Sequence, residues 1–179
     1  MWTLNKPRPV KLIVGVLAAD ARCLAAAREA IALEFGAADF ISDVWPFTQT
    51  QYYEEEAGEH ILRQFVSVES LIAPGDLAQI KHRANRLEQA LASELAAGLP
   101  RPVNLDPGYI EPSKLVLAST KNFSHRIYIG DNMYAEVTLT YARGVWIVYP
   151  YTFSDYQQKA YHDFFDRVRS RLVEQLKEI

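Results

Sequence analysis

The sequence predicts an α+β fold in which a ferredoxin-like β-α-β-β-α-β core is followed by an antiparallel β-meander and a C-terminal helix. Strand-like and helix-like apolar periods alternate in that order up to residue 106, and four short strand-like segments separated by turns come next. The length of 179 residues is typical of one domain. We therefore expect a single domain, with 10–106 as the ferredoxin-like half and 113–179 as the meander and helix.

The first strand is predicted at Val10–Ala18, a nearly continuous apolar run with β-branched residues. A helix should follow, because Asp20 can cap its start, Gly36 can end it and apolar residues recur between them at helical spacing. Ala38–Trp45 predicts the second strand.

A polar connection, Thr48–Glu59, comes next and is long for a compact domain, so we interpret it as a mobile lid or a plain loop. Ile61–Ser70 predicts the third strand. The apolar stripe Leu77–Leu95 predicts a long helix that Gly98 ends.

Four basic residues lie on or beside the polar side of this helix: Lys81, His82, Arg83 and Arg86. We interpret them as part of a solvated face, and the alternative is an RNA-contact patch. Val103–Leu105 predicts a short fourth strand, closed by the turn Asp106-Pro107-Gly108.

In the second half, short turns separate four predicted strands, Lys114–Ser119, His125–Ile129, Met133–Tyr141 and Val145–Tyr149. The last helix should begin near Asp155.

A three-residue hairpin loop at Gly130-Asp131-Asn132 would pair Ile129 with Met133, Ile127 with Ala135 and Arg126 with Glu136. Strand alternation then places six residues on one polar face: Lys114, Arg126, Tyr128, Tyr134, Glu136 and Thr138. Ser119 and His125 fall on the apolar face. Because neighbours in a strand point in opposite directions, His125 and Arg126 should line one pocket only if a bulge intervenes.

On the polar face, Lys114 and Arg126 could hold a phosphate or carboxylate, with Glu136 orienting Arg126 or acting as a base. The alternative is a solvated sheet face with one cross-strand ion pair, worth about 0.2–1 kcal/mol. The pattern alone favours this alternative.

Three further residues each have two interpretations. His125 is either an acid or base at a cleft or a hydrogen-bonded core histidine. Asp106 either contacts a substrate or only forms its turn. Lys121, in the tight loop after Ser119, either binds an anion or only shapes the loop.

Composition excludes several classes of function. A net charge of -3 and a pI near 5.8 argue against general nucleic-acid binding. Cys23 is the only cysteine, and the four histidines are scattered, so neither a disulfide nor a metal site is predicted and no cofactor is indicated. Without a signal-peptide pattern or a membrane-length apolar run, we expect a cytoplasmic protein that does not associate with membranes.

Several strings together resemble a bacterial family known as domain of unknown function 4416: Val103-Asn104-Leu105-Asp106-Pro107-Gly108-Tyr109, the segment from Lys114 to Lys121, His125-Arg126-Ile127-Tyr128 and Tyr134–Leu139. The resemblance extends upstream over most of the chain, through Thr48, Tyr52-Tyr53, Gly58, Arg63-Gln64-Phe65, Leu71-Ile72, Lys81, Asn85 and Glu88. Where the family has Trp-Thr-x-Pro-Asp-Tyr, this chain has Tyr151-Thr152-Phe153-Ser154-Asp155-Tyr156. The resemblance implies no activity, but its concentration on Asp106, Lys114, Lys121 and His125 favours a functional role for that region.

We therefore predict a site for a small anionic ligand, such as a nucleotide or another phosphate ester. The expected ligand-binding residues are Lys114, Ser119, Lys121, Arg126, Tyr109 and Tyr134. Acid–base work, if a reaction occurs, would fall to Asp106, His125 and Glu136. The alternative is a non-enzymatic module that binds protein or RNA, or a second copy of the chain as a homodimer.

Overall fold

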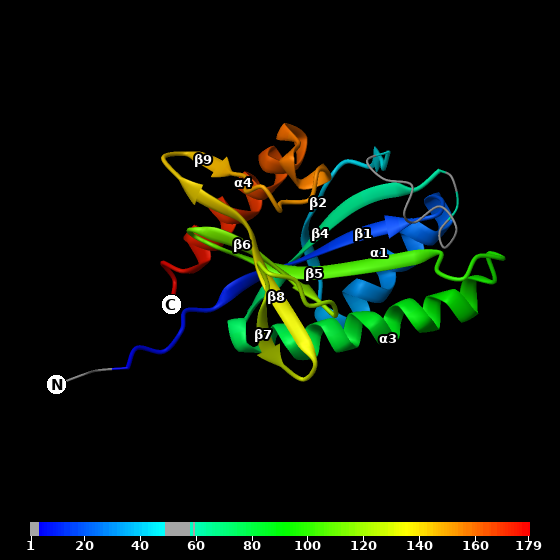
Figure 1. The fold of residues 1–179 in the computed structure, drawn as a ribbon, viewed down its shortest axis with the longest axis horizontal. Coiled ribbons are helices and arrows are strands. Elements are labelled where there is room, and N and C mark those ends of the chain that lie inside the picture. The colour runs from blue at the N-terminus through cyan, green and yellow to red at the C-terminus, as the bar shows by residue number, and fades with distance from the viewer. Residues whose placement is uncertain (1–3, 49–57, 59) are drawn as a thin grey trace.

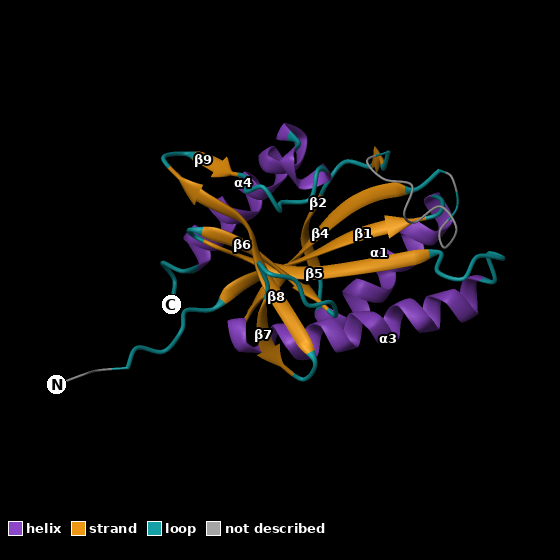
Figure 2. Cartoon of the chain, in the orientation of Figure 1, coloured by secondary structure: helices purple, strands orange, loops and turns teal. Residues whose placement is uncertain are grey.

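The structure is a computed structural model that describes residues 4–48, 58 and 60–179. Most of the predicted connection Thr48–Glu59 lies outside the described residues, so the interpretation of that segment as a lid stays a prediction. The fold combines one antiparallel sheet with helices on both of its faces (Figure 1, Figure 2).

The chain forms these elements in order: β1 (Val10–Ala18), α1 (Ala21–Phe35), β2 (Ala38–Ile41), β3 (Trp45–Pro46), β4 (Leu62–Ile72), the 3-10 helix η1 (Pro74–Asp76), α3 (Leu77–Leu95), β5 (Val103–Glu111), β6 (Lys114–Ser119), β7 (Ile127–Gly130), β8 (Met133–Ala142), β9 (Val145–Ile147), η2 (Asp155–Gln157) and α4 (Lys159–Gln175).

The strand order in the sheet is β2-β4-β1-β5-β6-β8-β7, with β3 paired to β4 and β9 paired to β8. Every pairing is antiparallel. β1 lies between β4 and β5 and is buried along its whole length, which explains why its sequence is apolar at nearly every position rather than at alternate ones.

Two apolar cores lie on opposite faces of the sheet. On one face, Val14 and its alternate neighbours in β1 pack against α1 and α3, through side chains such as Ile31 and Ala84. On the other face, Ile13 and Phe65 pack against α4 through Tyr161 and neighbouring aromatic side chains. α3 and α4 accordingly flank the sheet on opposite sides (Figure 1).

The predicted start and end of α1 are confirmed. The Cys23 backbone N–H donates to the Asp20 carboxylate at 2.7 Å, and Gly36 follows the last turn with a φ of 108°. α3 ends earlier than Gly98, because Ala96 already adopts the left-handed conformation with a φ of 45°.

Two of the strands predicted in the first half differ clearly from the structure. Ala38–Trp45 is divided into β2 and β3. The turn predicted at Asp106-Pro107-Gly108 is wrong, since these residues continue β5. β6 pairs with β5 only from Gly108 onward, so Pro107 stands where the β5–β6 ladder has not begun. A Cβ on Gly108 would lie 2.3 Å from the Val116 carbonyl oxygen, so glycine permits the close approach of β6.

The β7–β8 hairpin has a two-residue loop in place of the predicted three-residue loop. Gly130 pairs with Met133, and Asp131 and Asn132 have φ values of 51° and 59°, as in a type I′ turn. A bulge between Tyr128 and Gly130 compensates for the shorter loop, so the predicted pairing of Ile127 with Ala135 is confirmed.

No helix within the described part of the chain is long and apolar enough to cross a membrane.

Candidate functional site

A cavity of about 720 Å³ opens where β5 and β6 separate. The strands are hydrogen-bonded from Gly108 to Glu111 of β5, and the cavity occupies the space beside the preceding residues of β5. We call it the cationic cavity. Its charged lining residues are Arg63, Lys81, Arg101, Asp106, Lys121, Arg126, Glu136 and Asp155, and its other polar and aromatic lining residues include Phe47, Asn104, Ser119, Thr120, Phe123, Phe153, Ser154 and Tyr156.

Five of the lining side chains are cationic and three are carboxylates. The cations come from β4, α3, the segment before β5 and the loop after β6, which lie far apart in the sequence. Glu88 lies behind this wall and accepts hydrogen bonds from the Arg101 guanidinium at 2.7 and 3.1 Å. Among the described residues that line the cavity, cations therefore outnumber carboxylates, although the net charge of the chain is negative.

Arg63 forms the innermost part of the wall. Its Nη2 donates to Asp155 at 2.8 Å, and its Nη1 lies 3.9 Å from Asp106. The Phe47, Phe65 and Tyr156 rings surround the guanidinium, with centroids 5.2–5.7 Å from Cζ. Nε and Nη1 have no hydrogen-bond partner among the described residues.

Room for this guanidinium depends on Gly15 in β1. A Cβ at Gly15 would lie 3.0 Å from both Arg63 Nη1 and the Tyr156 hydroxyl. Burial raises the pKa of Asp155 while the Arg63 charge opposes that rise, and burial raises the pKa of Tyr156 well above its ordinary value. Arg63, Asp155 and Tyr156 thus form a tightly enclosed polar cluster.

Lys81 enters the cavity from α3. Its Nζ donates to the Leu105 carbonyl at 2.7 Å and lies 3.7 Å from the Asp106 carboxylate. The Asp106 carboxylate also accepts a hydrogen bond from the Asn104 side-chain amide at 2.7 Å, and the Asp106 side chain is 31% exposed. Burial raises the pKa of Glu88, against the opposing charges of Lys81 and Arg101. Asp106 is therefore an accessible carboxylate with cations on two sides.

Arg126 and Glu136 form a buried ion pair at the other wall. Arg126 Nε donates to Glu136 Oε2 at 2.8 Å, and the two side chains are only 6% and 1% exposed. Arg126 Nη1 also donates to the Ser119 hydroxyl at 2.8 Å and to the Lys121 carbonyl at 2.9 Å. The guanidinium therefore ties the loop after β6 to β8.

His125 contacts the same carboxylate. Its Nε2 lies 3.2 Å from Glu136 Oε2, and Thr138 donates to the other oxygen at 3.0 Å. His125 does not line the cationic cavity as Arg126 does, but both side chains contact Glu136 Oε2 and so do not point in opposite directions. β7 begins only at Ile127, so both residues belong to a turn in which strand alternation does not apply.

The predicted face shared by Lys114, Arg126 and Glu136 is also wrong. A bulge between Leu115 and Val116 shifts the β6–β8 register, and Glu136 lies opposite Leu117. Directly paired residues share a face, so Glu136 lies with Leu117 and Ser119 rather than with Lys114. The predicted separation of Ser119 from Arg126 is wrong because Arg126 lies in the turn before β7, from which its guanidinium reaches the Ser119 hydroxyl.

Lys114 and Tyr109 line a second cavity of about 450 Å³, which is mostly apolar. Leu77, Val116 and Ile127 are among its lining residues, and His125 and Glu136 also reach it. We call this the apolar cavity. The Lys114 ammonium is paired with Glu111.

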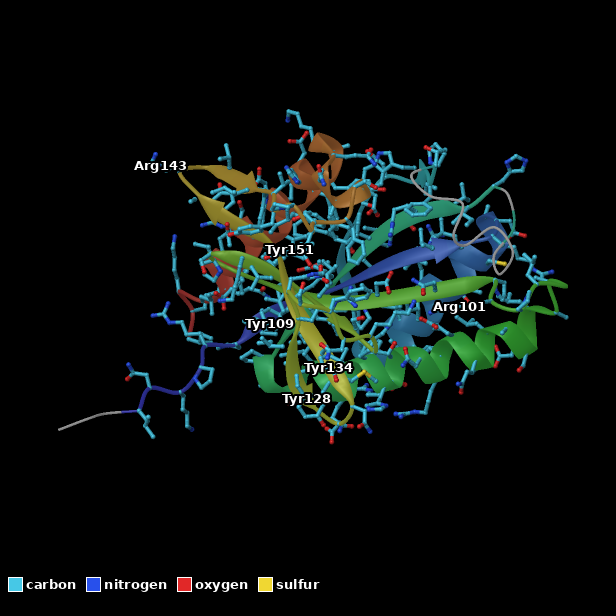
Figure 3. The ribbon with its side chains drawn as sticks, in the orientation of Figure 1. Arg101, Tyr109, Tyr128, Tyr134, Arg143 and Tyr151 are labelled. Carbon is cyan, nitrogen blue, oxygen red and sulfur yellow. The ribbon has the colours of Figure 1, made fainter. Side chains whose placement is uncertain are left out.

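Tyr134 lines neither cavity. Its ring packs edge-on against Tyr128, with centroids 5.6 Å apart, at the β7–β8 hairpin and away from Arg101 (Figure 3). Of the predicted site residues, the structure therefore brings five together at the cationic cavity: Asp106, Ser119, Lys121, Arg126 and Glu136. His125 contacts this group through Glu136. Lys114, Tyr109 and Tyr134 lie apart from it.

In a comparison with known families, residues 8–172 match the domain of unknown function DUF4416. The chain belongs to the DUF4416 family. Comparisons with curated proteins and with solved structures found no match. In this DUF4416 protein, the strings that carry the family resemblance include Arg63, Lys81, Asp106, Lys121 and Arg126, all of which line the cationic cavity.

Sequence reasoning missed the inner wall of the cavity in this DUF4416 member. Lys81 was assigned to a solvated helix face, yet it is buried. Its spacing held the signal, because Leu77, Lys81, Ala84, Glu88 and Leu91 follow one face of α3. Arg63 is likewise a lone cation inside an apolar strand pattern, which is a position that requires a buried partner. That partner, Asp155, is distant in the sequence.

The part of the chain that the structure describes contains no group of three or more His, Cys, Asp or Glu side chains placed to hold a metal ion.

Proposed function

We propose that this protein binds a small anionic, phosphate-bearing ligand in the cationic cavity. The observation that carries the proposal is the convergence of five cationic side chains from separate segments on one cavity of about 720 Å³. Pockets of about 300–1,000 Å³ are typical of small-molecule sites. Bringing like charges together is unfavourable unless anions compensate them, and a phosphate-bearing ligand would add such compensation.

Each wall suggests a role. Lys121, in the exposed loop after β6, and Arg101 would approach the ligand from the mouth of the cavity. Arg126 supplies a guanidinium fixed by Glu136 and Ser119, and a fixed fork suits the oxygens of a phosphate. Lys81 would act from the inner side.

Asp106 is the proposed acid–base group if a reaction takes place. It is the most exposed of the three lining carboxylates, and it lies 3.7 Å from the Lys81 ammonium. Glu136 is occupied by three hydrogen-bond partners, so its role would be to position Arg126 and His125.

The proposal extends to the fold. We propose that the segment from β1 to β5 is a ferredoxin-like unit within a single domain. Support comes from the antiparallel order β2-β4-β1-β5, from a helix after β1 and another after β4, and from the continuation of the sheet into β6.

The test is isothermal titration of the full chain with inorganic phosphate and pyrophosphate at low and high salt. We expect binding of pyrophosphate that weakens as salt rises, because the contacts are ionic. At about 100 times the dissociation constant, a ligand adds roughly 2.7 kcal/mol of stability, so a thermal shift should accompany it.

Lys121→Ala is the informative variant, because Lys121 is exposed and its removal leaves the buried ion pairs in place. We expect a loss of at least about tenfold in pyrophosphate affinity, consistent with a charge-assisted contact. Lys114→Ala is the matched control, since it removes an equal charge beside the apolar cavity and should leave the affinity unchanged. Equal effects of the two variants, or no binding at all, would refute the proposal.

The interaction module remains the second candidate, and one observation favours it. β7 is the last strand of the sheet, and Ile127 and Tyr128 on it are 68% and 60% exposed. Exposed edge strands with apolar side chains are typical sites of strand pairing. Light scattering over a range of protein concentrations tests this: a homodimer that Ile127→Lys disrupts would support it, and a monomer at all concentrations would contradict the homodimer version.

A further inference from the structure

We infer that the ligand of the cationic cavity is a nucleoside phosphate, whose base stacks on Phe123 and Phe153 while its phosphates contact the cations. The inference rests on the proposed anion-binding function and names its ligand class. Three features support it: exposed aromatic rings in the cavity lining, their position beside the cations, and an accessible carboxylate suited to a sugar hydroxyl.

Two aromatic rings of the cavity lining are exposed. Phe123 and Phe153 both line the cationic cavity, yet 55% and 45% of their surfaces are exposed. Leaving a phenylalanine ring in water forfeits the stabilisation that its burial would provide. A planar apolar group of a ligand would cover both rings, whereas inorganic phosphate would cover neither.

Phe123 also ends a column of nearly parallel rings. Tyr149 and Tyr151 stack at 5.3 Å, Tyr151 and His125 at 4.4 Å, and His125 and Phe123 at 6.0 Å, with interplanar angles of 4°, 6° and 16°. The column reaches the cavity at its most exposed ring. A base could extend the column there, because every nucleobase has a π-face that stacks on aromatic side chains.

The cations lie next to this platform. The Arg126 guanidinium carbon lies 4.9 Å from the centroid of the Phe123 ring, and Arg126 Nη1 donates to the carbonyl of Lys121 in the same loop. Phe153 lies two residues before Asp155, the carboxylate that pairs with the Arg63 guanidinium. Stacking and ionic groups are thus adjacent on both sides of the cavity.

Asp106 provides the third feature. Its carboxylate is partly exposed in the cavity and is held by the Asn104 amide and by the nearby Lys81 charge. A fixed carboxylate is a suitable acceptor for the hydroxyls of a ribose. The cavity therefore presents groups that suit a base, a sugar and a phosphate, which distinguishes a nucleotide from a simple aryl phosphate.

Isothermal titration of the full chain with ADP, GDP, CDP, UDP, ribose 5-phosphate, pyrophosphate and phenyl phosphate tests the inference. Stacking on an aromatic side chain contributes about 1–3 kcal/mol per base, which corresponds to roughly 5- to 150-fold in affinity. We expect at least one of the four nucleotides to bind more tightly than pyrophosphate and ribose 5-phosphate by a factor in this range. We also expect phenyl phosphate, which lacks the sugar, to bind more weakly than that nucleotide.

Phe153→Ala and Phe123→Ala should each reduce the affinity for that nucleotide by a larger factor than the affinity for pyrophosphate, while Phe153→Trp should retain the nucleotide advantage. Tyr128→Ala is the control, because it removes an exposed ring outside both cavities. If pyrophosphate binds through Lys121 but no nucleotide binds more tightly, or if both alanine variants leave nucleotide binding intact, the inference is overturned and the anion site stands. Phenyl phosphate binding as tightly as the best nucleotide overturns it too. If no phosphate compound binds, the proposed function itself fails.

Discussion

Neutralising Glu136 should destabilise this protein far more than removing an ordinary surface ion pair. Glu136→Gln keeps the size of the side chain and one carbonyl oxygen, but it removes the charge that compensates Arg126. Both side chains are nearly inaccessible to water, and the carboxylate also accepts from Thr138. Breaking a buried ion pair by changing one partner costs about 3–5 kcal/mol, because the other charge is left buried without compensation.

Urea unfolding of wild type and variant gives the free energy of unfolding and its slope with denaturant. We expect Glu136→Gln to lower the midpoint by an amount equivalent to about 3–5 kcal/mol with an unchanged slope. In a double-mutant cycle with Arg126→Gln, the second substitution should add less than it does alone, since the unpaired charge has gone.

Glu111→Gln is the matched control. Glu111 and Lys114 also form an ion pair on this sheet, but their side chains are 26% and 32% exposed. Exposed pairs contribute about 0–1 kcal/mol, so this variant should be close to wild type. If Glu136→Gln loses no more stability than Glu111→Gln, the assignment of Glu136 to a buried network is wrong and the solvated-face interpretation is correct.

Two further predictions concern the strands and the pH dependence. Gly108→Ala should lower the free energy of unfolding in urea by at least about 3 kcal/mol, the upper range for overpacking, because the new Cβ would lie 2.3 Å from the Val116 carbonyl oxygen. Gly75→Ala is the control, since it has open space around it and should change stability by less than about 1 kcal/mol. Similar losses in both variants would contradict the close approach of the two strands. Burial raises the folded-state pKa of Glu88 above its unfolded value of about 4.3, so the folded protein holds this proton more tightly than the unfolded chain does. The unfolding free energy of wild type, relative to that of Glu88→Gln, should therefore fall as pH rises from about 4.3 through the raised pKa. Above the raised pKa the difference should stay constant. Urea unfolding between about pH 4 and pH 7 measures this difference, and a rise with pH would mean that Lys81 and Arg101 outweigh burial.

The sequence predicts the elements of this fold well where period and end signals agree. The doubly buried run of β1, the Asp20 cap and the stripe of α3 are each local properties of a few neighbouring residues, and each prediction is confirmed within a few positions. The end of a strand is harder to predict when pairing rather than turn chemistry decides it. Asp106-Pro107-Gly108 has the composition of a turn, but pairing with β1 keeps it extended.

The candidate site is predictable only in part. The residues after β6 carry a visible concentration of polar groups, and Ser119, Lys121, Arg126 and Glu136 do meet there. Their relative faces depend on a one-residue bulge in the β6–β8 pairing, which no local pattern reveals and which reverses the side that each following residue occupies. Arg63 and Asp155 are 92 positions apart, so their contact is a consequence of tertiary structure alone.

The separation of β5 from β6 connects these observations. A continuous pairing along both strands would have closed the sheet where the cavity now lies, and the polar groups of Asn104 and Asp106 would have faced a neighbouring strand. Because the ladder starts only at Gly108, the Leu105 backbone is free to bond with side chains of α3 instead: its carbonyl accepts from Lys81 and its N–H donates to Glu88. Those bonds draw two charged residues of α3 into the interior, where each requires a partner. The same opening therefore both creates the cavity and supplies the buried charges along its inner wall, which is why the charged groups of this negatively charged chain gather at the point where its sheet divides.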